Sequence, residues 1–237
     1  MKYLITVLRH EAGEKESYWQ SFEYCSDRED ETVANALNCL NNCEQLRDVQ
    51  GDPARKIEWE CSCLQKKCGA CAMVINGRPA LACDVTLSRF TDGKIVLSPL
   101  KKFPVVCDLT VDRSIMYENL KTMKLWLNTE ARLSDDEQKT AYESSQCIQC
   151  GCCLEVCPNF RPKGSFYGMN AIGITNRLLT EMDLDDAGEI MKEYERHTFA
   201  GCGKSLACKN VCPKGIDTEK LMVNANAIAI WKRKKRG

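Results

Sequence analysis

The stretch of this chain that decides its fold is Cys147-Ile148-Gln149-Cys150-Gly151-Cys152-Cys153-Leu154-Glu155-Val156-Cys157-Pro158. Four of its cysteines follow the spacing C-x2-C-x2-C-x3-C-P, where x is any residue. In this spacing the first three thiolates bind one iron–sulfur cluster, and the fourth binds a neighbouring cluster. The run therefore predicts two clusters, and it requires a second segment of cysteines to complete them.

A second segment follows the spacing C-x5-C-x3-C-P, and Ser205 stands where the first run has its second cysteine. In the crossed arrangement, one cluster keeps four thiolates and the other keeps three. The four-thiolate set predicts a [4Fe-4S] cluster bound by Cys147, Cys150, Cys153 and Cys212. The three-thiolate set predicts a [3Fe-4S] cluster bound by Cys157, Cys202 and Cys208. The alternative for the second cluster is that the hydroxyl of Ser205 binds a fourth iron.

A third set of cysteines precedes both runs. The spacing C-x4-C-x2-C, followed after eleven residues by a fourth cysteine, is typical of a plant-type [2Fe-2S] site. Gly69 permits close approach of the backbone to a cluster. Asn76-Gly77, between two apolar runs, predicts a β-hairpin that returns the fourth cysteine to the other three. The predicted [2Fe-2S] ligands are Cys63, Cys68, Cys71 and Cys83.

Strand and helix patterns divide the chain near Pro104. Residues 3–8, 22–24 and 95–97 predict strands, and a helical pattern begins after Thr32, which is a suitable N-cap. Beyond the linker, an apolar stripe from Ile115 to Leu127 predicts a helix. We therefore expect a strand-rich [2Fe-2S] ferredoxin-like domain over residues 1–104 and a helical domain with two clusters over residues 105–237.

Composition limits the function classes. The chain has 33 basic and 33 acidic side chains, so we expect no nucleic-acid partner. Seventeen cysteines indicate disulfides or metal sites, depending on the compartment. The apolar N-terminal run breaks at Arg9 and resembles no signal peptide, and no stretch approaches the ~20 apolar residues that span a bilayer. We therefore expect a cytoplasmic chain whose thiols stay reduced.

Six cysteines lie outside the three sets. Cys61 would need the spacing C-x6-C, which fits no plant-type pattern, and use of Cys152 would break both flanking spacings. We expect the six to be small buried hydrophobic side chains. They are Cys25, Cys39, Cys43, Cys61, Cys107 and Cys152.

The order of the three sites resembles that in the iron–sulfur subunits of succinate dehydrogenase and fumarate reductase. The likeness covers nearly the whole chain and extends to residues 68–79, 103–106, 111–114 and 212–215. It implies an α+β fold, in which an N-terminal β-grasp plant-type [2Fe-2S] ferredoxin domain is followed by an all-α bacterial-type ferredoxin domain.

The resemblance also implies a function in a quinol:fumarate reductase or succinate:quinone oxidoreductase. In this family a flavoprotein subunit with bound FAD interconverts succinate and fumarate, and a membrane anchor subunit presents the quinone. The present chain would pass electrons between them through [2Fe-2S], [4Fe-4S] and [3Fe-4S] clusters. It would be a peripheral subunit at the cytoplasmic face of the cell membrane, and only its partners would bind FAD and haem.

Two departures bear on the quinone. The ubiquinone-reactive members have tryptophans shortly after the first Cys-Pro and a histidine directly after the first cysteine of the second run. Here those places hold Arg161-Pro162 and Gly203. This chain is more similar to the menaquinone-linked members, whose anchor usually carries haem, and we expect menaquinone as the partner quinone.

No set of residues indicates acid–base catalysis. The sequence around the two histidines, His10 and His197, shows no pattern of catalytic acids and bases. The glycines form no motif that binds dinucleotides or phosphates. We expect no catalytic residue and no dicarboxylate active site in this chain. Its contribution to the enzyme complex would be electron transfer alone.

Two other functions compete with this hypothesis. A soluble adaptor of a thiol-linked fumarate reductase or heterodisulfide-type enzyme would use similar clusters, but such relatives often append a Cys-Cys-Gly domain that this sequence lacks. A structural zinc site would use separated C-x2-C pairs. The continuous run from Cys147 to Cys157 favours iron–sulfur clusters over zinc.

Overall fold

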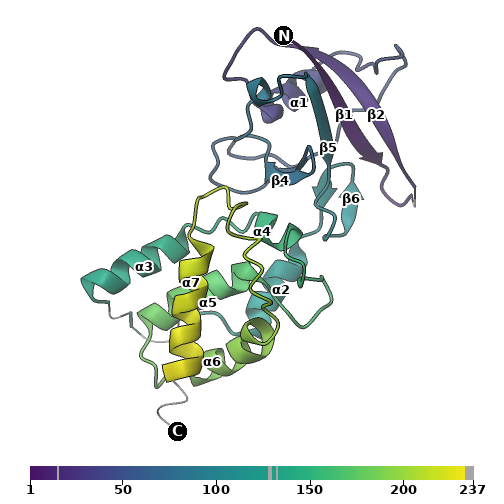
Figure 1. The fold of residues 1–237 in the computed structure, drawn as a ribbon. Helices are drawn as coiled ribbons and strands as arrows, with labels where there is room; N and C mark the ends of the chain where they lie inside the picture. The colour runs from purple at the N-terminus through teal and green to yellow at the C-terminus, as the bar shows by residue number, and fades with distance from the viewer. Residues whose placement is uncertain (15, 128–129, 132, 233–237) are drawn as a thin grey trace. The chain divides into compact units, whose positions relative to one another are not determined.

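The chain forms two units in a computed structural model, which describes residues 1–14, 16–127, 130–131 and 133–232. Unit 1 is Met1–Asp112 and unit 2 is Arg113–Gly237. Among the described residues, every strand lies in unit 1, and the regular elements of unit 2 are helical (Figure 1). The prediction of a strand-rich part followed by a helical part is therefore confirmed.

Unit 1 contains a five-stranded sheet with the strand order β2-β1-β5-β3-β4. Strand β1, which is second in this order, pairs antiparallel with β2 and parallel with β5. Strand β3 pairs antiparallel with β4 and with β5. A separate two-stranded sheet contains β6 and β7. The elements are β1 (Lys2–His10), β2 (Ser17–Cys25), α1 (Val33–Asn41), β3 (Ala72–Ile75), β4 (Arg78–Leu81), η1 (Leu87–Arg89), β5 (Lys94–Ser98), β6 (Val105–Cys107) and β7 (Thr110–Val111).

The core of unit 1 follows from the alternation of buried residues in its strands. Ile5 and Val7 of β1 are fully buried, whereas Leu4, Thr6 and Leu8, which alternate with them, are more exposed. Helix α1 begins where Thr32 was predicted to cap it, since the Thr32 hydroxyl accepts a hydrogen bond from the Asn35 N–H at 3.2 Å. Its apolar stripe, which includes fully buried Leu37, belongs to the core of unit 1, and the helix lies beside the sheet (Figure 1).

The hairpin predicted at Asn76-Gly77 is also confirmed. Strands β3 and β4 pair from Ala72↔Leu81 to Ile75↔Arg78. Asn76 and Gly77 both have positive φ, of 44° and 79°, as the two-residue turn between twisted strands requires. Because Cys71 and Cys83 flank this hairpin, the pairing returns the second cysteine to the first.

The boundary between the units lies eight residues after the predicted one, at Asp112 rather than Pro104. The intervening segment forms β6 and β7 and is bonded to the end of β1. The Asp108 N–H donates to the His10 carbonyl at 2.9 Å, and the Cys107 thiol donates to the same oxygen at 3.2 Å. The Phe-Pro sequence is therefore a bend within unit 1 and not the link between domains.

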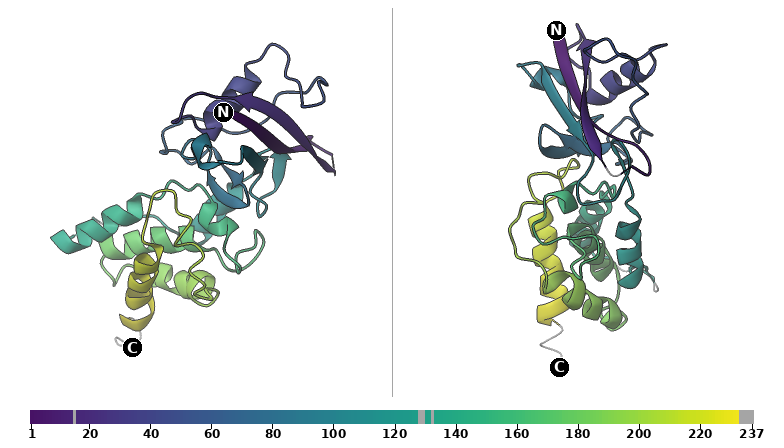
Figure 2. Two further views of the ribbon diagram at one scale, coloured as in Figure 1. Left: turned by 45° about the horizontal axis from the view of Figure 1, so that its top comes forward. Right: turned by 90° about the vertical axis from the view of Figure 1, so that its right-hand side faces the viewer.

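Unit 2 is built around helix α5, which packs against α3 and α7 (Figures 1 and 2). Buried Asn176 of α5 donates to the Ser144 hydroxyl of α3 and accepts from Asn224 of α7, both at 2.8 Å. The helix predicted through Leu127 ends at Thr122, because Lys124 has a left-handed φ of 54°. The elements are α2 (Ser114–Thr122), α3 (Asp135–Ser145), α4 (Cys152–Glu155), α5 (Met169–Glu181), α6 (Gly188–Tyr194), η2 (Glu195–Phe199), α7 (Thr218–Asn226) and η3 (Ala227–Lys232).

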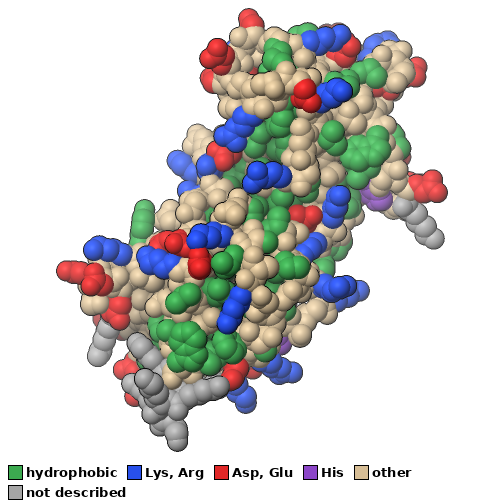
Figure 3. All heavy atoms as spheres, viewed as in Figure 1, with side chains coloured by type: hydrophobic (Ala, Val, Ile, Leu, Met, Phe, Trp, Pro, Cys, Tyr) green, Lys and Arg blue, Asp and Glu red, His purple; other side chains and the backbone are tan. Residues whose placement is uncertain are grey.

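Charged side chains of both signs are spread over the molecular face drawn in Figure 3. The helices of the described chain are all too short or too polar to cross a bilayer.

A buried ion pair joins three segments of unit 1. The side chains of Arg9 and Asp108 are both fully buried, with 3.1 Å between Nη2 and Oδ2. Asp108 also accepts from the Arg55 guanidinium at 2.6 Å and from the N–H groups of His10 and Glu58 at 2.9 Å. Burial raises the pKa of Asp108, but the Glu58 N–H and the Arg9 guanidinium outweigh it and hold this pKa below its ordinary value.

We predict that Asp108→Asn lowers the free energy of unfolding of unit 1 by about 3–5 kcal/mol at pH 7, because it leaves Arg9 buried without a counter-charge. Since the folded-state pKa of Asp108 is depressed, its stabilisation is present above the unfolded value of about 3.9 and is lost as the pH falls through the folded value. The difference between variant and parent should shrink in acid. Urea unfolding followed by hydrogen exchange of β1 amides measures it.

The matched control is Asp30→Asn, which removes an exposed carboxylate paired with Arg28 at 3.1 Å. Exposed pairs contribute about 0–1 kcal/mol, so this variant should unfold almost like the parent. Equal losses from the two variants would contradict a structural role for the buried pair.

Candidate iron–sulfur cluster sites

The loop that carries the first cysteines of unit 1 directs backbone N–H groups at sulfur atoms. The Cys63 Sγ accepts from the N–H groups of Gln65 and Lys67, each at 3.3 Å, and the Cys83 Sγ accepts from the Lys66 N–H at 3.4 Å. This geometry requires positive φ at two residues with side chains, Leu64 (52°) and Lys66 (59°). The loop therefore favours negative charge on sulfur, as in a metal-bound thiolate.

The structure brings together the four thiols of the predicted [2Fe-2S] set. Bonds from the N–H groups of Gln65 and Lys67, and then from the Cys68 thiol, lower the pKa of Cys63 to about 7. Burial raises the pKa of Cys71, which lies against Cys83, to about 12. Because iron binds the deprotonated sulfur, cluster binding at this loop would release protons from the buried thiols.

Two cavities in unit 2 divide the remaining seven thiols into a group of four and a group of three. The first cavity is lined by all four thiols of the predicted [4Fe-4S] set: Cys147, Cys150, Cys153 and Cys212. Its other walls are largely apolar and include Met116 and Ile216. Such a cavity has the sulfur donors and the low polarity that suit a buried cluster.

Polar contacts at this first cavity were not predicted from the sequence. The side-chain amide of Gln149 donates to the Cys147 Sγ at 3.2 Å, and Arg113 donates to the Cys150 carbonyl at 3.4 Å. Burial raises the pKa of Cys147 to about 11. The sequence does show a glutamine between two cysteines of the run. It does not show that the glutamine side chain reaches a sulfur atom, because that contact depends on the conformation of the loop.

The second cavity is lined by the three thiols of the predicted [3Fe-4S] set, Cys157, Cys202 and Cys208, and also by Ser205. The Thr218 hydroxyl donates to the Cys208 Sγ at 3.6 Å. Apolar side chains, including Phe166 and Ile172, form its other walls. The structure therefore places Ser205 in the wall of the same cavity as these three thiols.

The expectation that the six other cysteines are buried is wrong for four of them. Only Cys152 is fully buried, in α4, and Cys107 is half-buried. The other four are exposed. Cys25 ends the edge strand β2, Cys39 lies on the solvent side of α1, and Cys43 follows the end of that helix. Cys61 lies in the irregular segment before the first cysteine loop.

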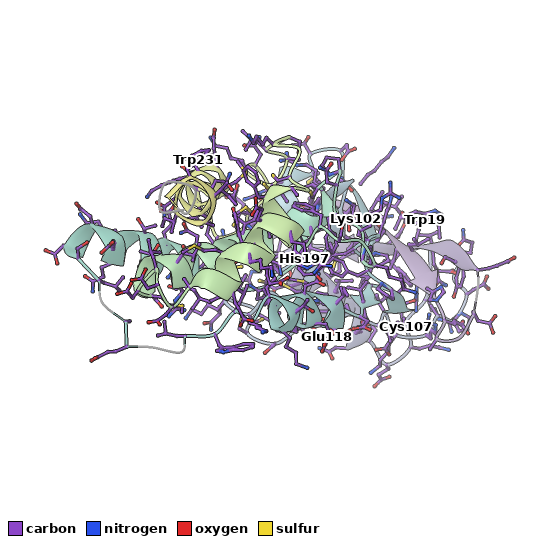
Figure 4. The ribbon with its side chains drawn as sticks, turned by 90° about the horizontal axis from the view of Figure 1, so that it is seen from below. Trp19, Lys102, Cys107, Glu118, His197 and Trp231 are labelled. Carbon is purple, nitrogen blue, oxygen red and sulfur yellow. The ribbon has the colours of Figure 1, made fainter. Side chains whose placement is uncertain are left out.

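The two histidines occupy structural surroundings. His197 lies inside unit 2 (Figure 4), stacked on the Tyr167 ring at 4.2 Å, with Nδ1 bonded to the Ser165 carbonyl at 2.9 Å and Nε2 3.2 Å from Glu193. His10 contacts the Ser17 hydroxyl at 3.2 Å. In the described part of the chain, no three Cys, His, Asp or Glu side chains converge on one point as a single metal ion needs. Thiolates of a cluster bind different iron atoms and stand further apart.

Comparison with known proteins also gives a [2Fe-2S] domain followed by a domain with two further clusters. The 2Fe-2S iron-sulfur cluster binding domain family matches residues 4–118, and the 4Fe-4S dicluster domain family matches residues 143–216. Among solved structures, a chain of the Mycobacterium smegmatis Sdh1 complex in the apo form is similar to this fold. Its TM-score is 0.75 and its identity 24%, covering 98% of this chain and 97% of that chain.

Two relatives share sequence with most of this chain. The succinate dehydrogenase iron-sulfur subunit of Bacillus subtilis is 35% identical over 195 residues, which are 76% of each protein. An uncharacterized iron-sulfur protein of Methanocaldococcus jannaschii is 34% identical over 219 residues, which are 90% of this chain and 40% of that protein. With a [2Fe-2S] domain followed by a [4Fe-4S] dicluster domain, the chain belongs to the family of iron–sulfur subunits of succinate dehydrogenase and fumarate reductase.

Proposed function

We propose that this chain is the electron-transfer subunit of a succinate:quinone oxidoreductase or quinol:fumarate reductase. The observation that carries the proposal is the grouping of eleven cysteines into three separate sulfur-lined sites within a member of this family. The chemistry that such sites supply is the passage of single electrons.

The proposed ligands follow the three sets of thiols. A [2Fe-2S] cluster is bound by Cys63, Cys68, Cys71 and Cys83. A [4Fe-4S] cluster is bound by Cys147, Cys150, Cys153 and Cys212. A [3Fe-4S] cluster is bound by Cys157, Cys202 and Cys208, while Ser205 leaves the fourth corner without a thiolate. The sulfur-lined cavities and the N–H donors to sulfur support this assignment.

Electron balance explains why such a subunit is needed. Oxidation of succinate to fumarate releases two electrons and two protons, and reduction of a quinone to a quinol takes up the same numbers. FAD accepts the pair, whereas iron–sulfur clusters pass electrons one at a time. The residues of this chain hold the clusters, exclude water from the two cavities of unit 2 and supply hydrogen bonds that tune the potentials.

The finer fold assignment is that unit 1 is a β-grasp domain of plant-type ferredoxin and unit 2 an all-α domain of bacterial type. Two features support the first part: β1 is an internal strand that runs parallel to the central strand β5, and α1 lies beside the sheet (Figure 1). The helical elements around both cavities of unit 2 support the second.

The proposed partners are a flavoprotein subunit with FAD and a membrane anchor subunit that carries haem and presents menaquinone. The name of the Bacillus subtilis relative, which describes a subunit of succinate dehydrogenase, supports a complex. Arg161-Pro162 and Gly203, which replace the tryptophans and histidine of ubiquinone-reactive members, favour menaquinone. In this arrangement the chain is peripheral, at the cytoplasmic face of the cell membrane.

A second candidate is a soluble adaptor that links a fumarate reductase to a thiol or disulfide substrate. One observation favours it: the similarity to the Methanocaldococcus jannaschii protein spans 90% of this chain and leaves 60% of that longer protein unmatched. A module of this kind can thus be joined to further sequence. The quinone-linked function stays our conclusion because the family relatives named by function are dehydrogenase and reductase subunits.

Isolation of the native complex separates the two candidates. We expect the chain to sediment with membranes together with a flavoprotein and a multi-helix subunit, and succinate to reduce its clusters until a menaquinone analogue reoxidises them. A chain that stays in the soluble fraction, and whose clusters are reoxidised by a disulfide but not by the quinone, would favour the adaptor.

We predict that Cys63→Ser removes the [2Fe-2S] signal from the electron paramagnetic resonance spectrum of the reduced protein, because the loop then lacks one thiolate. The matched control is Cys61→Ser, two residues away in an exposed position, which should keep all the signals. Loss of the [2Fe-2S] signal in the control, with retention in the first variant, would show that the ligand register is wrong.

We also predict that Ser205→Cys converts the [3Fe-4S] cluster to [4Fe-4S], because Ser205 lines the second cavity beside the three proposed ligands. The oxidised-state [3Fe-4S] signal should disappear, the potential should fall, and reduction of quinone should slow. Ser165→Cys, at a residue outside that cavity, is the control. An unchanged [3Fe-4S] signal in Ser205→Cys would refute the proposed vacant corner.

A further inference from the structure

The side chain of Gln149 lies between two proposed ligands of the [4Fe-4S] cluster and touches one of them. We propose that Gln149 is a positioning residue that raises the reduction potential of this cluster, by donating a hydrogen bond from its amide to the ligand sulfur of Cys147. The inference rests on the ligand set given under the proposed function.

The backbone of Gln149 has a conformation that brings this donor to the sulfur. Its φ is 52°, in the left-handed region that residues with a side chain rarely adopt. From that backbone the amide Nε2 reaches the Cys147 Sγ at 3.2 Å, and the side chain lines the same cavity as the four thiols. The donor is thus part of the cluster cavity itself.

A second amide fixes the orientation of the first. Asn170, the second residue of α5, is 2% exposed, lines the same cavity and donates from Nδ2 to the Gln149 Oε1 at 3.3 Å. If the Gln149 amide were turned over, its oxygen would face the anionic sulfur and its nitrogen would face the Asn170 nitrogen. The pair therefore holds the N–H of Gln149 on the thiolate.

Asn170 adopts this orientation at a cost. Its Oδ1 is buried and has no hydrogen-bond partner among the described residues, and buried polar atoms are seldom left unpaired. Rotating the Asn170 amide would place its oxygen against the Gln149 Oε1, so the unpaired atom cannot be relieved without losing the donor to Cys147. The arrangement favours the hydrogen bond to sulfur over full pairing of Asn170.

The electrostatic consequence has a definite sign. Reduction adds an electron to the cluster and increases the negative charge on its sulfur ligands. A donor to a ligand sulfur therefore stabilises the reduced state more than the oxidised state, and it raises the potential. The other cavity has its own donor, since Thr218 bonds to the Cys208 Sγ. The two sites can thus be altered one at a time.

Redox titration of the cluster-loaded full-length chain, followed by electron paramagnetic resonance, tests the inference with Gln149→Met, which keeps the length of the side chain but removes the donor. We expect the equilibrium constant for reduction of the [4Fe-4S] cluster to fall about tenfold, which is a fall of about 59 mV in its reduction potential for one electron. The [2Fe-2S] and [3Fe-4S] potentials should not move.

Two further variants are matched controls. Gln138→Met makes the same exchange on the exposed side of α3 and should move no potential. Thr218→Val should lower the [3Fe-4S] potential alone. A loaded Gln149→Met protein with an unchanged [4Fe-4S] potential overturns the inference and leaves the ligand assignment standing.

Failure of the ligand assignment would look different. If the parent chain, with iron and sulfide loaded, gave no [4Fe-4S] signal, the site itself would be refuted. If only Gln149→Met failed to bind the cluster, Asn170→Leu decides, because it keeps Gln149 and removes the group that orients it. A lowered [4Fe-4S] potential in that variant supports the inference, and an unchanged potential overturns it.

Discussion

The rest of the structure depends on one constraint: short loops must turn several sulfur atoms, and the N–H groups that bond to them, toward the same point. Eight described residues other than glycine have a positive φ, and five of them lie in the three loops between closely spaced cysteines: Leu64, Lys66, Gln149, Lys204 and Leu206. The left-handed conformation costs roughly 1–2 kcal/mol for such residues. The loops accept this strain because the positions of the sulfur atoms, and not the local preference of the backbone, decide their shape.

Features set by neighbouring residues could be predicted from the sequence. The Asn76-Gly77 turn, the Thr32 cap and the helical stripe that follows it depend on contacts only a few residues apart, and all three are present. The grouping of the cysteines belongs to the same class in part. Spacing alone assigned Cys157 and Cys212 to opposite sets, and the two cavities of unit 2 divide these two thiols in the same way.

Features set by contacts distant in sequence could not be predicted. Arg9 interrupts an apolar strand, a pattern typical of an exposed charge. Its side chain is instead buried, because it forms an ion pair with Asp108, 99 residues away in unit 1. The same contact draws residues 105–112 into unit 1 and moves the boundary from its predicted place. The exposure of Cys39 and Cys43 depends on which side of α1 faces the sheet, and the role of Gln149 depends on Asn170 in a separate helix.

The strained loops have a consequence for the life of the protein when iron is scarce. The left-handed backbone at these residues of the cysteine loops costs conformational free energy, and bonds from sulfur to iron would offset that cost. Those loops are the segments that gain most by opening, and an opened surface loop is a preferred substrate for proteases. Cluster binding at these loops would therefore also protect them from proteolysis.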